Sequence, residues 1–242
     1  MKNILILGCS FTAGSYQSLS KKLSKNVLSL SPNLIPKDEL ILPRHGWWYF
    51  VDYFKDNNVT VIAFSAQGYW AYYQILLYLE EQNKLEYDEI WIQETLEPRA
   101  TINNYKDISS QFELNDRYII NETFKLFDID SYLMFSLNPR SCKKEHEPYS
   151  LWHSFFNEIT KLCAKNIDKL CAEKNIKGYV WSMNNSVMKC EHFTRLPVVH
   201  MRTELKNNNL LVPGTSDGLH QTEDGSKYIG KLINNICIDT KI

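Results

Sequence analysis

Four short apolar runs of strand type recur along this chain, and helical patterns lie between them. The runs cover residues 4–7, 59–64, 89–93 and 177–181. Runs so short and apolar are typical of strands buried on both faces of a sheet. Strands that alternate with helices predict a parallel sheet with helices on both of its faces. We therefore expect an α/β fold, a three-layer sandwich with about five strands, the fifth at residues 197–200.

The helical patterns cover residues 47–55, 69–81, 151–174 and 226–237, and an aromatic-rich stretch at 118–135 is a further candidate helix. On the longest of these, one face carries Trp152, Phe155, Phe156, Ile159, Leu162 and Cys163. No repeat or linker interrupts the order. We expect one domain over residues 1–242, with irregular insertions near 15–45, 97–150 and 184–216.

Composition narrows the class of protein. The 242 residues are 44% hydrophobic and carry a net charge of −1, so no global field favours nucleic acid or an anionic membrane. No apolar run approaches the ~20 residues that span a bilayer, and the stretch before Cys9 is too short for a signal peptide. The six cysteines form no Cys-x-x-Cys pair and have no zinc-finger spacing. We expect a mature cytoplasmic protein with reduced thiols, no metal site and no cofactor.

The first run ends in a turn that presents a serine. Ser10 follows Gly8 and Cys9, just past the carboxyl end of the strand, where ligands collect in open α/β sheets. Gly8 and Gly14 bracket a turn that can take backbone angles closed to other residues. Such a turn can present a nucleophile, but the same pattern also suits a phosphate-binding turn or a plain strand-to-helix connection.

The other end of the chain holds a carboxylate and an imidazole three residues apart. Asp217 and His220 lie in a loop before the helical pattern at 226–237, with Thr222 as the expected N-cap of that helix. A serine nucleophile needs a base and an acid that holds the tautomer of the base. The alternative is a turn with a surface histidine.

Together these segments resemble the SGNH (GDSL-type) hydrolase family. The first block of that family reads Gly-Asp-Ser-x-Thr/Ser-x-Gly, and this chain has Gly-Cys-Ser-Phe-Thr-Ala-Gly from residue 8. The last block reads Asp-x-x-His, matched by Asp217 and His220, and Gly68 fits the second block. The third block, Gly-x-Asn-Asp, is absent, and this chain has Gln-Glu-Thr-Leu-Glu-Pro-Arg from residue 93.

The resemblance implies a flavodoxin-like strand order and an ester hydrolase mechanism. Ser10 would be the nucleophile, His220 the general base and Asp217 the residue that orients His220. The backbone N–H groups of Ser10 and Gly68 would stabilise the oxyanion. Because the asparagine of the third block is missing, Gln93 or Thr95 is the candidate for a third donor.

Other residues carry weaker signals. Cys9 lies beside Ser10, but neighbouring side chains point in different directions, so we expect a buried thiol rather than a rival nucleophile. Arg99, Arg195 and Arg202 are candidates to bind an anionic substrate group, and equally suit surface ion pairs.

Two classes of function follow. The first is a serine hydrolase of carboxylic esters, with a small-molecule or carbohydrate ester such as an O-acetylated sugar as substrate. The second is a catalytically weak or inactive protein of the same fold with a binding or structural role. An acyltransferase is a variant of the first. The sequence sets no oligomeric state.

Overall fold

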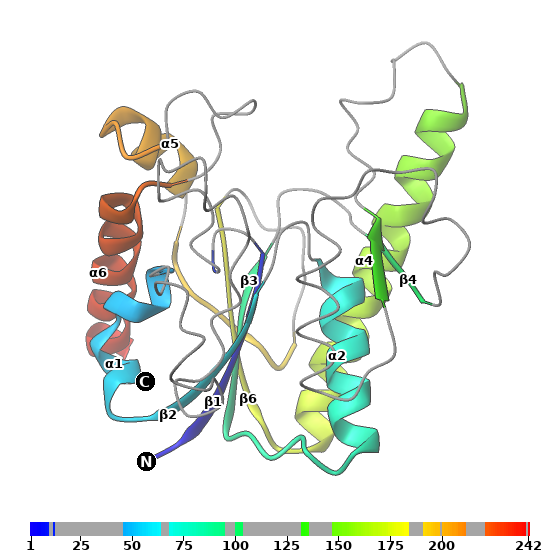
Figure 1. The fold of residues 1–242 in the computed structure, drawn as a ribbon, viewed down its shortest axis with the longest axis horizontal. Coiled ribbons are helices and arrows are strands. Elements are labelled where there is room, and N and C mark those ends of the chain that lie inside the picture. The colour runs from blue at the N-terminus through cyan, green and yellow to red at the C-terminus, as the bar shows by residue number, and fades with distance from the viewer. Residues whose placement is uncertain are drawn as a thin grey trace, which may run out of the picture.

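The structure is a computed structural model that describes residues 1–9, 12, 46–63, 68–94, 100–103, 132–135, 147–183, 191–198, 200–211, 221–240 and 242. Its centre is a five-stranded parallel sheet (Figure 1). The strands are β1 (Asn3–Gly8), β2 (Asn58–Ala63), β3 (Glu89–Glu94), β6 (Lys177–Ser182) and β7 (Thr194–Arg195). Their order is β2-β1-β3-β6-β7. The α/β fold class and the flavodoxin-like order are therefore confirmed, and β1 and β3 lie at the switch point of the sheet.

The register brings the carboxyl ends of neighbouring strands to one level. Gly8 pairs with Ala63 on β2, and Leu7 pairs with Ile92 on β3. Gln93 in turn pairs with Trp181 on β6. The residues that follow these positions therefore meet at one edge of the sheet.

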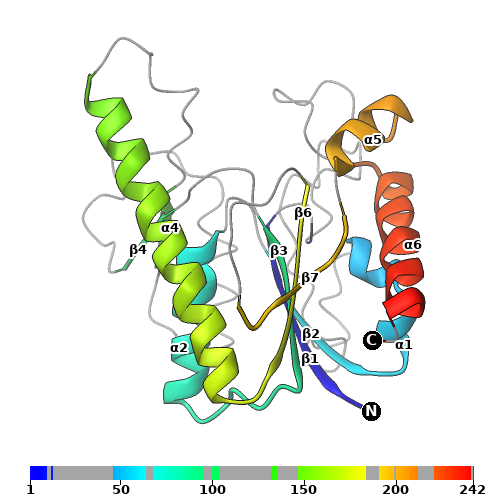
Figure 2. The same ribbon diagram turned by 180° about the vertical axis from the view of Figure 1, so that it is seen from behind.

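Helices cover both faces. The 3-10 helix η3 (Trp47–Phe50), α1 (Asp52–Lys55) and α6 (Glu223–Thr240) lie on one face, and α2 (Tyr69–Glu81) and α4 (Glu147–Glu173) lie on the other (Figures 1 and 2). The short helix α5 (Met201–Asn207) follows β7. The prediction of three layers is thus confirmed.

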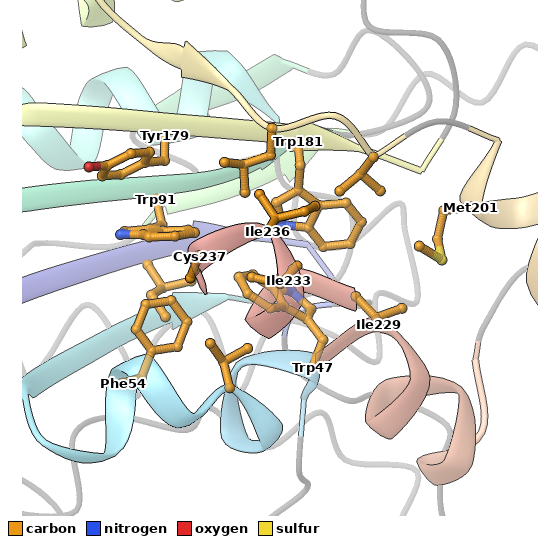
Figure 3. Close-up of a cluster of buried hydrophobic side chains, with 14 of the residues drawn as sticks. Trp47, Phe54, Trp91, Tyr179, Trp181, Met201, Ile229, Ile233, Ile236 and Cys237 are labelled. Atoms are coloured by element: carbon orange, nitrogen blue, oxygen red, sulfur yellow. The ribbon is translucent and has the colours of Figure 1, made fainter. Parts of the chain in front are cut away.

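Two hydrophobic clusters separate these layers. The four residues 4–7 of β1 are fully buried, as expected for a strand covered on both faces. Alternate residues face opposite layers: Ile4 and Ile6 contact the α6 side, and Leu5 and Leu7 contact the α2 side. On the α6 side, Trp47 packs edge-on against Trp181, with ring centroids 5.2 Å apart (Figure 3).

One predicted helix is divided in two. The pattern at 47–55 forms η3 and α1, because Val51 between them has extended backbone angles, φ −96° and ψ 114°. The break does not expose the apolar face, since Trp47, Val51 and Phe54 are all buried. The same spacing also predicts a buried Phe50, which is only partly buried. The periodicity therefore identified three of the four side chains correctly and missed the break.

The predicted insertions at 97–150 and 184–216 are not irregular throughout. The first contains the antiparallel pair β4 (Ala100–Asn103) and β5 (Tyr132–Phe135), so a helix over 118–135 is wrong at its last four residues. It also contains the start of α4. The second contains β7 and α5.

The fifth strand lies earlier than the predicted 197–200. It is Thr194–Arg195, and the Leu196 N–H still donates to the Val180 carbonyl at 2.9 Å. The next N–H on that side, that of Val198, donates back to the Leu196 carbonyl at 2.7 Å instead of to β6, so the pairing ends there.

Leu162 was expected on the buried face of α4, but 56% of it is exposed. The buried stripe instead follows Cys163, Ala164, Ile167, Leu170 and Cys171. This spacing is that of one helical face, and Leu162 lies beside it. Within the described part of the chain, no helix has the length and apolarity needed to cross a membrane.

Candidate active site

Chemically active side chains gather where the strands end. Cys9 follows β1, Gln93 and Glu94 close β3, and each is at most 3% exposed. The first turns of α2 and α6 lie at the same edge of the sheet (Figure 1). Ligands bind at this edge in open parallel sheets, so it is the candidate site.

Two of the seven predicted site residues, Gly68 and Gln93, belong to the described residues. Ser10, Thr95, Arg99, Asp217 and His220 lie outside them. For four of these five the adjoining residue in the chain is described: Cys9, Glu94, Ala100 and Gln221. These neighbours define where the chain enters and leaves the candidate site.

Cys9 and Thr12 flank the Ser10–Phe11 pair and are joined directly. The Thr12 N–H donates to the Cys9 carbonyl at 2.9 Å. Cys9 is 1% exposed, as predicted for a buried thiol. This hydrogen bond therefore fixes the residues on both sides of Ser10 and Phe11 relative to each other.

Gly8 serves a different purpose from the one predicted. Its backbone is outside the left-handed region, but a methyl group there would overlap the side chain of Thr12. Gly46 plays a matching part, since a methyl group there would overlap the Thr12 carbonyl. Both glycines are needed for close approach rather than for unusual backbone angles.

The segment with Asp217 and His220 is held at both ends. Leu211 and Gln221 form an antiparallel bridge, and the Thr222 N–H donates to the Leu210 carbonyl at 2.8 Å. The Thr222 hydroxyl accepts from the Gly225 N–H at 3.0 Å, so the predicted N-cap of α6 is confirmed. Gln221 is 1% exposed, which fixes the chain immediately after His220.

The 3-10 helix η3 connects α6 to the Ser10 turn. A methyl group at Gly230 of α6 would lie 2.6 Å from Phe50 Cβ and 2.8 Å from the Trp47 carbonyl oxygen. The Trp47 indole N–H in turn donates to Thr12 Oγ1 at 3.1 Å. Helix α6 and Thr12 therefore contact the same element, η3.

The carboxamide of Gln93 is buried and used at one end only. Its Oε1 accepts from the Thr12 hydroxyl at 2.5 Å, and the Cys9 thiol lies 3.8 Å from the same oxygen. Its Nε2 has no hydrogen-bond partner among the described residues. A buried N–H donor without a partner is costly and rare in native proteins, so this one calls for an acceptor.

The start of α2 is tied to the end of β3. The Tyr69 hydroxyl donates to Glu94 Oε1 at 2.9 Å, and the Tyr72 hydroxyl donates to the Gln93 carbonyl at 3.4 Å. Gly68 is the N-cap of α2, and its carbonyl accepts from the Tyr72 N–H at 3.1 Å. The Gly68 N–H makes no hydrogen bond to another described residue, so it remains a candidate donor to a ligand.

Sequence reasoning missed the polar groups that support this edge. Thr12 matched a motif position without an assigned role, Trp47 was placed only in a helix, and Glu94 only in the segment that replaces the third block. A buried tryptophan directly after Gly46 was the available signal for close packing at Thr12. Among the described residues, no group of three or more histidine, cysteine, aspartate or glutamate side chains is placed to hold a metal ion.

No protein-family model matches the sequence, and a search of curated proteins gives no match. Among solved structures, the chain is similar to the esterase EstA from Pseudoalteromonas sp., at 11% identity and a TM-score of 0.40, over 99% of this chain and 96% of that one. It is also similar to a GDSL-like lipase from Bacteroides thetaiotaomicron, at 13% identity and a TM-score of 0.32, over 100% and 89% of the two chains. An acetyl-xylooligosaccharide esterase from Geobacillus gives 12% identity and a TM-score of 0.34, over 97% and 93%. Likeness at this level assigns no activity.

Proposed function

We propose that this protein is a serine hydrolase of carboxylic esters, with Ser10 as nucleophile, His220 as general base and Asp217 as the residue that orients His220. Ser10 directly follows Cys9 at the switch point of the sheet. His220 directly precedes Gln221, just before the first turn of α6 at the same edge. The ends of both segments are fixed by hydrogen bonds, as a preorganised site requires.

The observation that carries the proposal is the unpartnered Nε2 of buried Gln93. In ester cleavage, negative charge develops on the carbonyl oxygen, and donors placed for that charge accelerate the reaction. Gln93 lies on β3, next to the strand that leads to Ser10. Its amide is therefore favoured over Thr95 as the third oxyanion donor, beside the backbone N–H groups of Ser10 and Gly68.

The reaction proceeds by acyl transfer. Ser10 Oγ attacks the ester carbonyl carbon while His220 takes the serine proton. The tetrahedral intermediate collapses, the alcohol leaves with the proton from His220, and an acyl-serine remains. Water, activated by His220, then releases the carboxylic acid and restores the serine. Arg99 is a candidate to bind an anionic part of the substrate.

The substrate is proposed to be a small-molecule or carbohydrate ester, including O-acetyl groups, in a cytoplasmic setting without nucleic-acid or membrane partners. Transfer of the acyl group to an acceptor other than water would use the same residues. Acyl transfer is distinguished from hydrolysis by adding acceptor alcohols and identifying the product by mass spectrometry.

The test is reaction with a fluorophosphonate probe, read by intact mass and peptide mapping. The Ser10 Oγ–P bond forms as the P–F bond breaks, and the serine proton passes to His220. We expect one adduct at Ser10, none in Ser10→Ala, and strongly slowed labelling in His220→Ala. His200→Asn, at an exposed left-handed position, serves as the histidine control and should label normally.

Hydrolysis of p-nitrophenyl acetate, butyrate and octanoate then ranks acyl length. Folded wild-type protein that neither labels nor hydrolyses these esters would exclude the proposal. It would favour the second class of function, a binding or structural role on the same fold.

A further inference from the structure

The two polar atoms of the buried Gln93 carboxamide differ in their hydrogen bonding. Two donors, the Thr12 hydroxyl and the Cys9 thiol, converge on Oε1, while Nε2 has no partner in the part of the chain that the structure describes. Gln93 is 0% exposed, so bulk solvent does not reach the Nε2 end. The asymmetry needs a cause, because a carboxamide can turn by 180° with little change in shape.

The hydrogen-bond donors and acceptors around Thr12 explain why the carboxamide keeps Oε1 toward this residue. The Trp47 indole N–H can only donate, so Thr12 Oγ1 accepts its hydrogen bond at 3.1 Å. The one hydroxyl hydrogen of Thr12 is then directed to Gln93 Oε1, 2.5 Å away. If the carboxamide turned over, its N–H groups would face this hydroxyl, and the hydroxyl hydrogen would lose its acceptor inside the protein.

Thr12 itself is held from every side. Its N–H donates to the Cys9 carbonyl, and its own carbonyl accepts from the Trp48 indole N–H at 3.0 Å. The absence of side chains at Gly8 and Gly46 makes room for it, and it is 0% exposed. The hydroxyl therefore cannot turn away from Gln93 without breaking this packing.

We propose that Thr12 is a positioning residue whose hydroxyl, set by the indole of Trp47, holds the Gln93 carboxamide with Nε2 toward the developing oxyanion. This inference rests on the proposed function for its chemical consequence. Its structural part, the fixed orientation of the carboxamide, stands on the hydrogen bonds alone. Thr12 acts through Gln93 and touches no reacting atom.

The kinetic test compares two substitutions of nearly equal size. Thr12→Val keeps the shape and removes the hydroxyl, and Thr12→Ser keeps the hydroxyl and loses a methyl group. We expect kcat for p-nitrophenyl acetate to fall ~10- to 100-fold in Thr12→Val with KM changed less than about threefold, and Thr12→Ser to recover most of kcat. Gln93→Glu, which removes the donor, should lose ~10²- to 10³-fold.

Wild-type kcat in Thr12→Val would overturn the proposal, and so would equal losses in Thr12→Val and Thr12→Ser, which would indicate packing alone. Urea midpoints of each variant establish that folded protein is compared.

Nuclear magnetic resonance of the Gln93 side-chain amide separates failure of this inference from failure of the proposed function, and in labelled wild-type protein it needs no Thr12 variant. Gln93→Glu identifies the signal by its loss. In wild-type protein we expect one narrow pair of amide protons, and a downfield shift of one proton when ethyl fluorophosphonate occupies Ser10. No shift in a labelled protein would overturn the inference while the hydrolase proposal stands.

If Ser10 does not label, the Thr12 variants test the orientation of the Gln93 carboxamide. Amide signals that broaden in Thr12→Val but not in Thr12→Ser would support the fixed orientation. Unchanged signals in both variants would overturn it.

Discussion

Lys2 Nζ lies 2.5 Å from Glu89 Oε1 at the edge of the sheet opposite the candidate site, and the two side chains are unequally buried. Glu89 is fully buried, whereas 41% of the Lys2 side chain is exposed. Glu89 also accepts from the Tyr53 hydroxyl at 2.7 Å and the Trp91 indole at 3.0 Å. The carboxylate, rather than the ammonium group, is therefore the centre of this cluster.

Glu89→Gln should lower the free energy of unfolding by about 3 kcal/mol, because the three hydrogen-bond donors around this side chain would no longer face a buried carboxylate. Lys2→Met should cost only about 1 kcal/mol, since Glu89 keeps two donors and Lys2 is partly solvated. Urea unfolding followed by tryptophan fluorescence measures both. Lys55→Met, in a well-exposed pair with Asp52, is the control and should stay within about 0.5 kcal/mol. Equal costs at Glu89 and Lys2 would contradict the ranking.

Asp168 anchors the chain before β7 to helix α4. Its carboxylate accepts from three successive backbone N–H groups, those of Glu191, His192 and Phe193, at 2.8 to 3.1 Å. Asp168→Asn keeps one acceptor oxygen and should cost about 2 kcal/mol. Amide hydrogen exchange should accelerate at residues 191–193 first. Glu173→Gln, exposed on the same helix, is the control, and unchanged exchange at 191–193 in Asp168→Asn would count against the anchor.

Gly230→Ala tests the contact between α6 and η3. Alanine would favour the helix by about 1 kcal/mol if space allowed, but its methyl group would meet Phe50 and the Trp47 carbonyl. We expect a net loss of about 2 kcal/mol. Asn235→Ala, exposed on the same helix, should be neutral or slightly stabilising. A stabilised Gly230→Ala protein would show that the two elements are not in close contact.

Three buried thiols predict a fall in stability at alkaline pH. Burial raises the pKa of Cys163 and Cys237 to about 11 and that of Cys171 to about 12. The unfolded chain loses these protons near pH 9, while the folded chain keeps them. The stabilisation is therefore complete below pH 9 and declines above it, by about 1.4 kcal/mol per pH unit for each thiol.

Urea unfolding at pH 7, 8, 9 and 10 measures this slope. Cys171→Ala should reduce the decline between pH 9 and 10 by about 1 kcal/mol, whatever its stability at pH 7. The wild-type profile should be flat from pH 7 to 8 as far as these thiols contribute. Parallel profiles for the two proteins would disprove the assignment to Cys171.

Local pattern was sufficient to predict the four longer strands of the sheet, whereas their order rested on the family resemblance. The fully buried run at 4–7 and the helix Tyr69–Glu81 were both evident because strong periodicity or apolarity spans the whole element. Short elements such as β7 and α5 were missed because two or seven residues hold too little periodicity. The break at Val51 was missed because both halves bury the same face.

For the candidate site, the sequence predicted which residues lie at the carboxyl ends of the strands but not how their side chains bond to one another. Gln93 was a candidate because it lies where the resembled family has its third block. The orientation of its Nε2 depends on Thr12 and Trp47, which no local pattern connects to it. Close approach at Gly8 likewise depends on the partner that packs there, so the sequence indicated a glycine requirement and suggested the wrong reason for it.

The hydrogen bonds from Trp47 to Thr12 and from Thr12 to Gln93 span 35 and 81 residues of sequence. Contacts of such long range form only after β1, β3 and η3 have come together. Recovery of the proposed esterase activity during refolding should therefore lag behind recovery of helical circular dichroism, and the rate of turnover would report the last stage of assembly.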